Sequence, residues 1–311
     1  MGYRDQVTGF ESPDLFPPSP RSSVPVRVGT SGFSFDDWVG RAYPAGLAKT
    51  KMLEYYAGVL GFDTVELNFT YYAMPTPRTL QSMVNRTGAG FCFVVRSHKD
   101  MTHDIWADED RRVLRDTGEV FKAFRDGISP LVDSGRLGCV LVQFPVFFYP
   151  VPQNFEYLRK MPALMPGVSI VVEFRNRAWL RPDAFRMLEE SGMGCCVVDE
   201  PKLSRLMPFE PRRTSDIAYF RFHGRNQNWF NASREERYNY LYSTAELEEF
   251  IPPLKSVSAG AKTTFVFFNN CHAGAAARNA LMMKQMLGLV DALTPEQTRV
   301  VEGEPAFRSP K

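Results

Sequence analysis

The sequence contains no apolar run that could cross a membrane. Its longest stretch without a charged residue runs from Leu137 to Phe155 and is interrupted by Gly138 and three prolines. A membrane-spanning helix needs about 20 predominantly apolar residues. The first 20 residues also lack the apolar segment of a secretory signal, and position 6 is Gln, where an N-myristoylation signal needs Ser or Thr. We therefore expect no membrane partner.

Cysteine is scarce, and the charges are almost balanced. The chain has five cysteines, an odd number, and most of them lie inside apolar, strand-like runs. This pattern favours reduced thiols and a cytoplasmic location. The 37 basic and 35 acidic residues leave a net charge of +2. That balance excludes a generic polyelectrolyte mode of nucleic-acid binding, although it is compatible with a local basic patch.

The composition predicts a folded protein with a short flexible extension. With 44% hydrophobic and 23% charged residues, the chain can bury enough apolar surface to offset its ordering entropy. Residues 1–25 differ from the rest because they are rich in Pro and Ser and show no periodicity. We expect a flexible tail over 1–25 and one domain over 26–311.

From Val26 onward, eight short apolar runs rich in β-branched residues recur, and amphipathic stretches separate most of them. The helix pattern is clearest from Glu119 to Ser134 and recurs at 51–60, 77–85, 183–191, 244–250 and 279–289. Strands that alternate with helices predict a parallel sheet. The expected strands are VRVGT, TVELN, FCFVVR, CVLVQF, VSIVVEFR, GCCVVDE, IAYFRFHG and TFVFFNN.

The number of repeats indicates the architecture. Eight strand–helix units in roughly 250 residues match a (β/α)8 barrel. The rival is a doubly wound open sheet, which usually carries a glycine-rich phosphate loop after its first strand. The segment GTSGFS from Gly29 does not fit GxGxxG. The sequence therefore predicts an α/β fold, a single TIM-type (β/α)8 barrel.

Polar residues gather where the predicted strands end. Four strands end in pairs two residues apart, which places both members on one face. In a barrel these ends line the functional face, and buried charges there need partners. The pairs are Glu66 with Asn68, Arg96 with His98, Glu173 with Arg175, and Arg221 with His223; Gln143, Asp199 and Asn269-Asn270 end three further strands, and only one of the two asparagines can point inward.

Several motifs together resemble one family. They are GTSGFSFDDW, RAYP, TVELNFTYYAMP, FVVRSHKDMTH, VLVQFP, VVEFRNRAW, YFRFHG and FNN followed by Asn279-Ala280. In this order they resemble the YecE-like family, domain of unknown function 72, from Val26 to Leu287. The resemblance implies a TIM-type barrel and no established reaction.

The chain departs from the usual pattern of that family at four positions. Arg96 and Lys99 stand where Lys and Arg are expected, Phe33 where Trp is usual, and Asn176 where His is usual. Arginine cannot replace lysine in Schiff-base chemistry, so Arg96 argues against a lysine-specific role.

The polar residues at the strand ends predict an enzyme of the hydrolase, lyase or isomerase class. Its expected substrate is a polar anionic ligand such as a phosphorylated sugar, a nucleotide or nucleic acid. Arginine binds phosphate and carboxylate through two parallel hydrogen bonds, which motivates the anion. Glu173 is the expected general acid or base and His223 its partner, with Glu66 and Asp199 as further catalytic acids. The expected substrate-binding residues are Arg96, Lys99, His103, Gln143, Arg175, Arg221, Asn68, Asn269, Asn270 and Trp179.

Two alternatives remain. In a metal-assisted phosphodiester hydrolase, Glu66, Glu173, Asp199 and His223 would bind a divalent ion, but the four histidines show no metal-ligand spacing, so no cofactor is predicted. In a non-catalytic nucleic-acid or nucleotide binder, residues 223–242, with their Arg, Asn and aromatic side chains, would contact a single strand. A lid over the barrel mouth is the favoured interpretation of this loop, because long loops in compact domains are usually site lids. The sequence does not define an oligomeric state.

Overall fold

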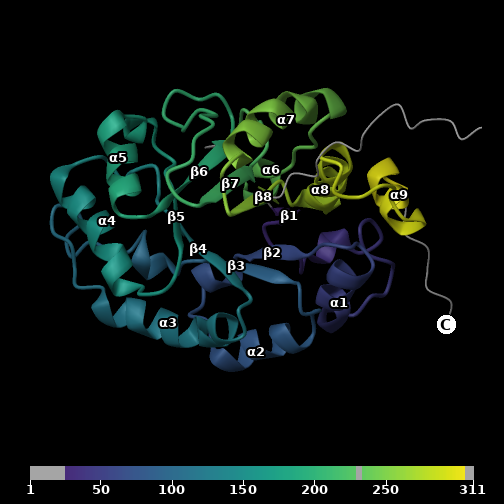
Figure 1. Ribbon diagram of the computed structural model, residues 1–311, viewed down its shortest axis with the longest axis horizontal. Coiled ribbons are helices and arrows are strands. Elements are labelled where there is room, and N and C mark those ends of the chain that lie inside the picture. Colours follow the sequence, from purple (N-terminus) through teal and green to yellow (C-terminus); the bar gives the residue numbers. More distant parts are fainter. Residues whose placement is uncertain (1–24, 229–232, 305–311) are drawn as a thin grey trace, which may run out of the picture.

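Eight parallel strands form a barrel in the computed structural model, which describes residues 25–228 and 233–304 (Figure 1). The strands are β1 (Val26–Thr30), β2 (Thr64–Leu67), β3 (Cys92–Arg96), β4 (Leu137–Gln143), β5 (Ile170–Glu173), β6 (Gly194–Asp199), β7 (Ile217–Phe222) and β8 (Thr263–Phe268). Hydrogen bonding links them in the order β1-β8-β7-β6-β5-β4-β3-β2. The TIM-type barrel is thereby confirmed. The tail expected over residues 1–25 lies outside the described residues except for Pro25.

The barrel closes between β1 and β2. Ser31 forms a parallel bridge with Glu66, and the Gly32 N–H donates to the Glu66 carbonyl at 2.8 Å. Gly29 permits this approach, because a Cβ atom there would lie only 2.4 Å from the Thr64 carbonyl oxygen. A larger residue at position 29 would push β1 away from β2.

Helices surround the strands (Figure 1). Six of them match the predicted helical segments: α1 (Met52–Gly58), α2 (Pro77–Asn85), α3 (Gly118–Asp133), α5 (Pro182–Glu190), α7 (Thr244–Ser258) and α8 (Ala275–Met286). Helices α4 (Pro152–Leu164), α6 (Arg234–Arg237) and α9 (Pro295–Glu302) lie outside those segments. Proline begins both α4 and α9, where its missing N–H costs nothing. None of the helices in the described ranges is long and apolar enough to span a membrane.

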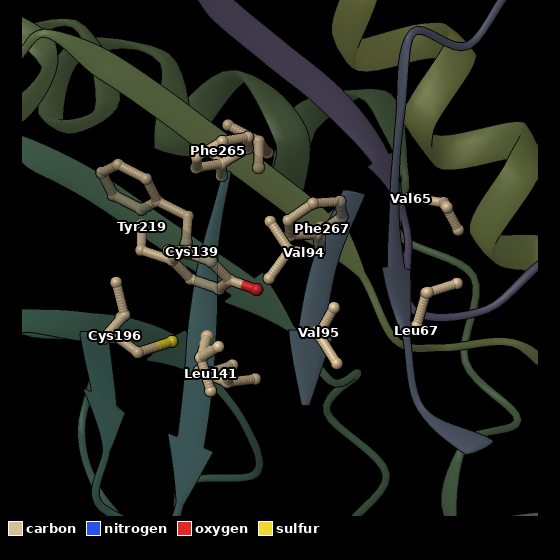
Figure 2. Packing of buried hydrophobic residues seen from close by; sticks show 14 of the residues in the cluster. Val65, Leu67, Val94, Val95, Cys139, Leu141, Cys196, Tyr219, Phe265 and Phe267 are labelled. Atoms are coloured by element: carbon tan, nitrogen blue, oxygen red, sulfur yellow. The ribbon is translucent and has the colours of Figure 1, made fainter. Parts of the chain in front are cut away.

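The side-chain alternation of the strands separates the barrel interior from the helix layer. Cys139, Leu141, Cys196, Tyr219, Phe265 and Phe267 lie close together in Figure 2. Cys196 of β6, Tyr219 of β7 and Phe265 of β8 are in register. Residues of the other parity face outward: Phe222 packs on Phe250 of α7, with ring centroids 4.7 Å apart. This alternation decides which strand-end side chains reach the candidate site.

Candidate functional site

Arg221 lies at the centre of a charged network inside the barrel. Its side chain is fully buried, and Nη1 donates to Glu173 Oε2 at 2.6 Å and to Gln143 Oε1 at 3.1 Å. Nη2 donates to Glu66 Oε1 at 2.7 Å, and the Tyr219 hydroxyl donates to Glu66 Oε2 at 2.6 Å. Arg221 therefore holds Glu66 and Glu173, two of the predicted catalytic acids. The hydrogen bond from Tyr219 to Glu66 joins residues that are 153 positions apart in the sequence.

The second layer of this network contains Arg175 and His223. Arg175 Nη1 donates to Glu173 Oε1 at 3.1 Å, and Nη2 lies 2.5 Å from Glu200 Oε2. Burial raises the pKa of Glu173, but Arg221, His223 and Arg175 outweigh it and hold that pKa well below its ordinary value. Glu173 thus stays ionised, which suits a structural anion better than a general acid.

His223 is neutral and held from both sides. Burial, with Arg175 adding to it, lowers the pKa of His223 to about 3. Its Nε2 lies 3.3 Å from Glu173 Oε1, and its Nδ1 lies 2.8 Å from Nδ2 of Asn269. Arg175 Nη1 also lies 3.2 Å from Nε2 and can only donate, so Nε2 accepts from Arg175 when the ring proton lies on Nδ1 and donates to Glu173 when the proton lies on Nε2.

The acid that β6 contributes to the site is Glu200, which the sequence analysis missed. Its side chain is fully buried, and the Met207 N–H donates to its Oε1 at 2.9 Å. Burial raises the pKa of Glu200 to about 8, and Arg175 opposes this shift only in part. Counting the alternation from Val198, which is in register with Arg221, would have found this residue.

Asp199, predicted as a catalytic acid, points to the other side of the sheet. It is in register with Phe222, which faces the helix layer. Its carboxylate accepts hydrogen bonds from Arg225 Nε at 3.0 Å and from the Tyr242 hydroxyl at 2.6 Å. The structure therefore places Asp199 away from Glu66 and Glu173, where it anchors the loop between β7 and α7.

A cluster of three side chains, Arg96, Tyr71 and His103, forms the part of the site that is only half-buried; we name it the mouth cluster. The Arg96 guanidinium carbon lies 4.0 Å from the centre of the Tyr71 ring. The His103 ring packs edge-on against the same tyrosine, with centroids 4.9 Å apart. Burial and then Arg96 lower the pKa of His103 to about 4, so its imidazole is neutral.

Arg96 has no carboxylate partner among the described residues. Ion pairs within residues 25–228 and 233–304 involve Arg175 and Arg221 but not Arg96, and its Nε is buried without a hydrogen-bond partner there. Burial, with Arg221 adding to it, lowers the pKa of Arg96. A guanidinium group in this position favours the binding of an anion, because no carboxylate of the described residues already pairs with it.

Three other predicted binding residues lie in different surroundings. Lys99 is paired with Asp104 through a 2.6 Å contact and is 44% exposed. Asn270 holds a loop, because its Nδ2 donates to the Tyr240 carbonyl and to Asn279. Asn68 precedes a 3-10 turn, and its Oδ1 is buried without a hydrogen-bond partner in the described chain.

Trp179 belongs to the core. Its ring is fully buried and stacks on Phe174 at 4.2 Å and on Phe148 at 5.3 Å. Its Nε1–H donates to the Phe148 carbonyl at 2.7 Å. The whole polar capacity of this indole is used inside the protein, so the structure does not bring Trp179 to the mouth.

The metal-ligand set considered from the sequence does not converge. Asp199 faces the helix layer, whereas Glu66 and Glu173 lie inside the barrel and contact Arg221. In the part of the chain that the structure describes, no group of three or more His, Cys, Asp or Glu side chains could hold a metal ion.

The fold and this interior define a TIM-type barrel with a buried ionic network below an arginine-bearing mouth. The family described as "Protein of unknown function DUF72" matches residues 27–301, and the chain belongs to that family. UPF0759 protein YunF of Bacillus subtilis is 32% identical over 289 residues, which cover 88% of this chain and 98% of the relative.

Two solved structures of the same family resemble this one. A DUF72 family protein of Thermotoga maritima has a TM-score of 0.79 and 45% identity, over 85% of this chain and 99% of that one. A DUF72 family protein of Enterococcus faecalis has a TM-score of 0.74 and 29% identity, over 87% and 98% of the two chains. These relatives support the fold and the family, and none of their descriptions assigns an activity.

Proposed function

We propose that this protein is an enzyme that binds a small anionic molecule, such as a phosphorylated sugar or a nucleotide, at the carboxyl ends of the barrel strands. The observation that carries the proposal is that Arg96 forms no ion pair with a carboxylate among the described residues. Arg221 contacts the Glu66 and Glu173 carboxylates and Arg175 contacts the Glu173 carboxylate and the Glu200 carboxyl, whereas Arg96 has no acid beside it in the described chain. A half-buried charge without a partner is costly, and an anionic ligand would relieve that cost.

His103 is the proton acceptor in this proposal. It shares the Tyr71 ring with Arg96, and the positive charge of Arg96 contributes to its low pKa. An anion bound to Arg96 would cancel part of that charge and raise the basicity of His103 toward the working pH, as general-base catalysis requires. Glu173 serves the site differently from the sequence prediction, since it keeps Arg175, Arg221 and His223 in place. The reaction class stays open among hydrolase, lyase and isomerase.

Replacing Arg96 with Gln is the direct test. We expect wild-type protein stripped of metal by chelator to be stabilised by a phosphorylated sugar or nucleotide in a thermal-shift panel. For the same ligand, calorimetric affinity of Arg96→Gln should fall by about 10- to 100-fold, because hydrogen bonds to a charged group are lost. Arg96→Lys keeps the charge and should lose less. Equal affinity of Arg96→Gln and wild type for every ligand that binds would refute the proposal.

The buried Glu200 makes anion binding depend on pH. Its pKa of about 8 means that its carboxyl is mostly protonated at neutral pH, so three guanidinium groups face only the Glu66 and Glu173 carboxylates. Above pH 8 the added negative charge should weaken binding several-fold. Sulfate is a suitable probe because its own charge stays constant there. The affinity of the wild-type protein for sulfate is expected to decline as the pH rises through 8. The Glu200→Gln variant should bind sulfate equally well below and above pH 8.

The same residue predicts a stability profile. The folded-state pKa of Glu200 lies above its ordinary value of 4.5, so the folded protein binds this proton more tightly than the unfolded chain. The free energy of unfolding should therefore fall between about pH 4.5 and 8 in wild type relative to Glu200→Gln. Parallel stability profiles of the two proteins in urea would contradict the raised pKa.

A further inference from the structure

A cavity of about 540 Å³ lies beside the first turn of α8 and the end of α9. Its walls come from the loop after β1, the loop before α7 and these two helices, which are neighbours in Figure 1. None of the mouth-cluster residues lines it. Its volume lies within the range of about 300–1,000 Å³ that small-molecule sites occupy.

Two arginines from opposite ends of the chain line this cavity. Neither Arg41 nor Arg278 forms an ion pair with a carboxylate in the described residues, and the Arg278 Nε is buried without a hydrogen-bond partner there. Gly303 leaves room for the guanidinium, since a Cβ atom at that position would lie 2.9 Å from Arg278 Nη1. Two cations that share a cavity repel each other unless an anion lies between them.

The acids near the cavity do not neutralise these arginines. Glu304, at the rim, is exposed. Asp37 is already engaged, because its Oδ2 accepts from the Ala273 N–H at 2.6 Å and lies 3.8 Å from His272 Nδ1. The described lining therefore keeps an excess of positive charge.

The backbone adds to this field. Helix α8 has 12 residues and begins at the cavity with Gly274 as N-cap, without a side-chain cap. The amino end of a helix carries partial positive charge and favours anions. In TIM barrels, phosphate groups frequently bind between the loops after the seventh and eighth strands and a helix amino terminus, which is where this cavity lies.

We propose that this cavity binds the phosphate group of a small phosphate ester, held by Arg41 and Arg278 at the start of α8. The arginines supply hydrogen-bond donors in the planar arrangement that phosphate oxygens accept, and the remaining volume accommodates the organic part of the ester. The proposal does not depend on the function of the mouth cluster, because none of Arg96, Tyr71 and His103 lines this cavity.

Titration of ¹⁵N-labelled full-length protein with inorganic phosphate and with glycerol 3-phosphate tests the site. We expect saturable shifts of the backbone amides from His272 to Ala275, with the ester binding at least as tightly as inorganic phosphate. Arg278→Gln and Arg41→Gln should each weaken binding by at least about tenfold. Arg278→Lys should bind with intermediate affinity, because lysine retains the charge without the two-pronged donor geometry.

Two control variants separate this site from general electrostatics and from the mouth. Arg181→Gln removes the same charge from an exposed residue paired with Asp183 just before α5, and it should leave the affinity unchanged. Arg96→Gln should likewise leave the His272–Ala275 shifts intact. The proposal is overturned if chloride at matched ionic strength produces the same shifts, if Arg41→Gln and Arg278→Gln bind phosphate as wild type does, or if the ester is excluded.

Discussion

Replacing Arg221 with Met is expected to lower the free energy of unfolding by about 3–5 kcal/mol, because it leaves Glu66 buried without a cation and leaves Glu173 with Arg175 alone. Both carboxylates and the guanidinium are fully buried, and the Arg221–Glu66 and Arg221–Glu173 contacts are 2.7 and 2.6 Å long. Urea unfolding followed by circular dichroism measures the change.

The charge explanation has its own control. If an uncompensated carboxylate causes the loss, adding Glu66→Gln to Arg221→Met should recover a large part of the stability, since Glu173 keeps Arg175 in the double variant. A purely steric effect of the shorter Met side chain would leave the double variant as unstable as the single one. A loss below about 1 kcal/mol in Arg221→Met would show that the network tolerates unpaired acids.

Replacing Trp179 with Ala should cost about 3–5 kcal/mol of stability and leave ligand affinity at the mouth unchanged. The indole is fully buried between Phe148 and Phe174, and its N–H is bound to a carbonyl. Chemical denaturation and calorimetry on the folded protein measure the two effects separately.

A matched variant makes the test sharper. Tyr149→Ala removes an aromatic ring that is 51% exposed and lies next to Phe148 in the loop between β4 and α4, so the stability of this variant should change far less. Trp179→Phe should retain most of the stacking and lose mainly the hydrogen bond to the Phe148 carbonyl. If Trp179→Ala reduced ligand affinity while stability stayed near wild type, Trp179 would regain the substrate-binding role that the sequence predicts.

Local alternation explains why Glu200, and not Asp199, reaches the network around Arg221. Asp199 and Glu200 are adjacent, and adjacent strand residues point to opposite faces. The hydrophobic run alone does not say which parity faces inward, because parallel strands in a barrel are apolar on both sides. The pairing of β6 with β7 resolves the ambiguity. Val198 is in register with the inward-facing Arg221, and Asp199 is in register with the outward-facing Phe222.

Local pattern likewise cannot tell whether an aromatic residue lies in the core or at a site. Trp179 follows a strand-end cluster of charged residues, as a ligand-stacking residue would. Its position is decided by Phe148 of the preceding unit, 31 residues earlier, whose carbonyl accepts its N–H. A contact over that distance is absent from any local window of sequence.

The sequence by itself determined the repeating strand–helix pattern, the barrel and the concentration of polar residues at the strand ends, because hydrophobic periodicity and residue type are local properties. It also brought Glu66, Gln143, Glu173, Arg175, Arg221, His223 and Asn269 into one predicted pocket, and the structure joins them in one network. Only the tertiary structure decided which of these charges neutralise each other. Arg221 meets Glu66 across 155 residues, whereas Arg96 packs on the Tyr71 ring and forms no ion pair in the described chain. Electrostatic interactions depend on distance and burial, which exist only once the barrel has closed.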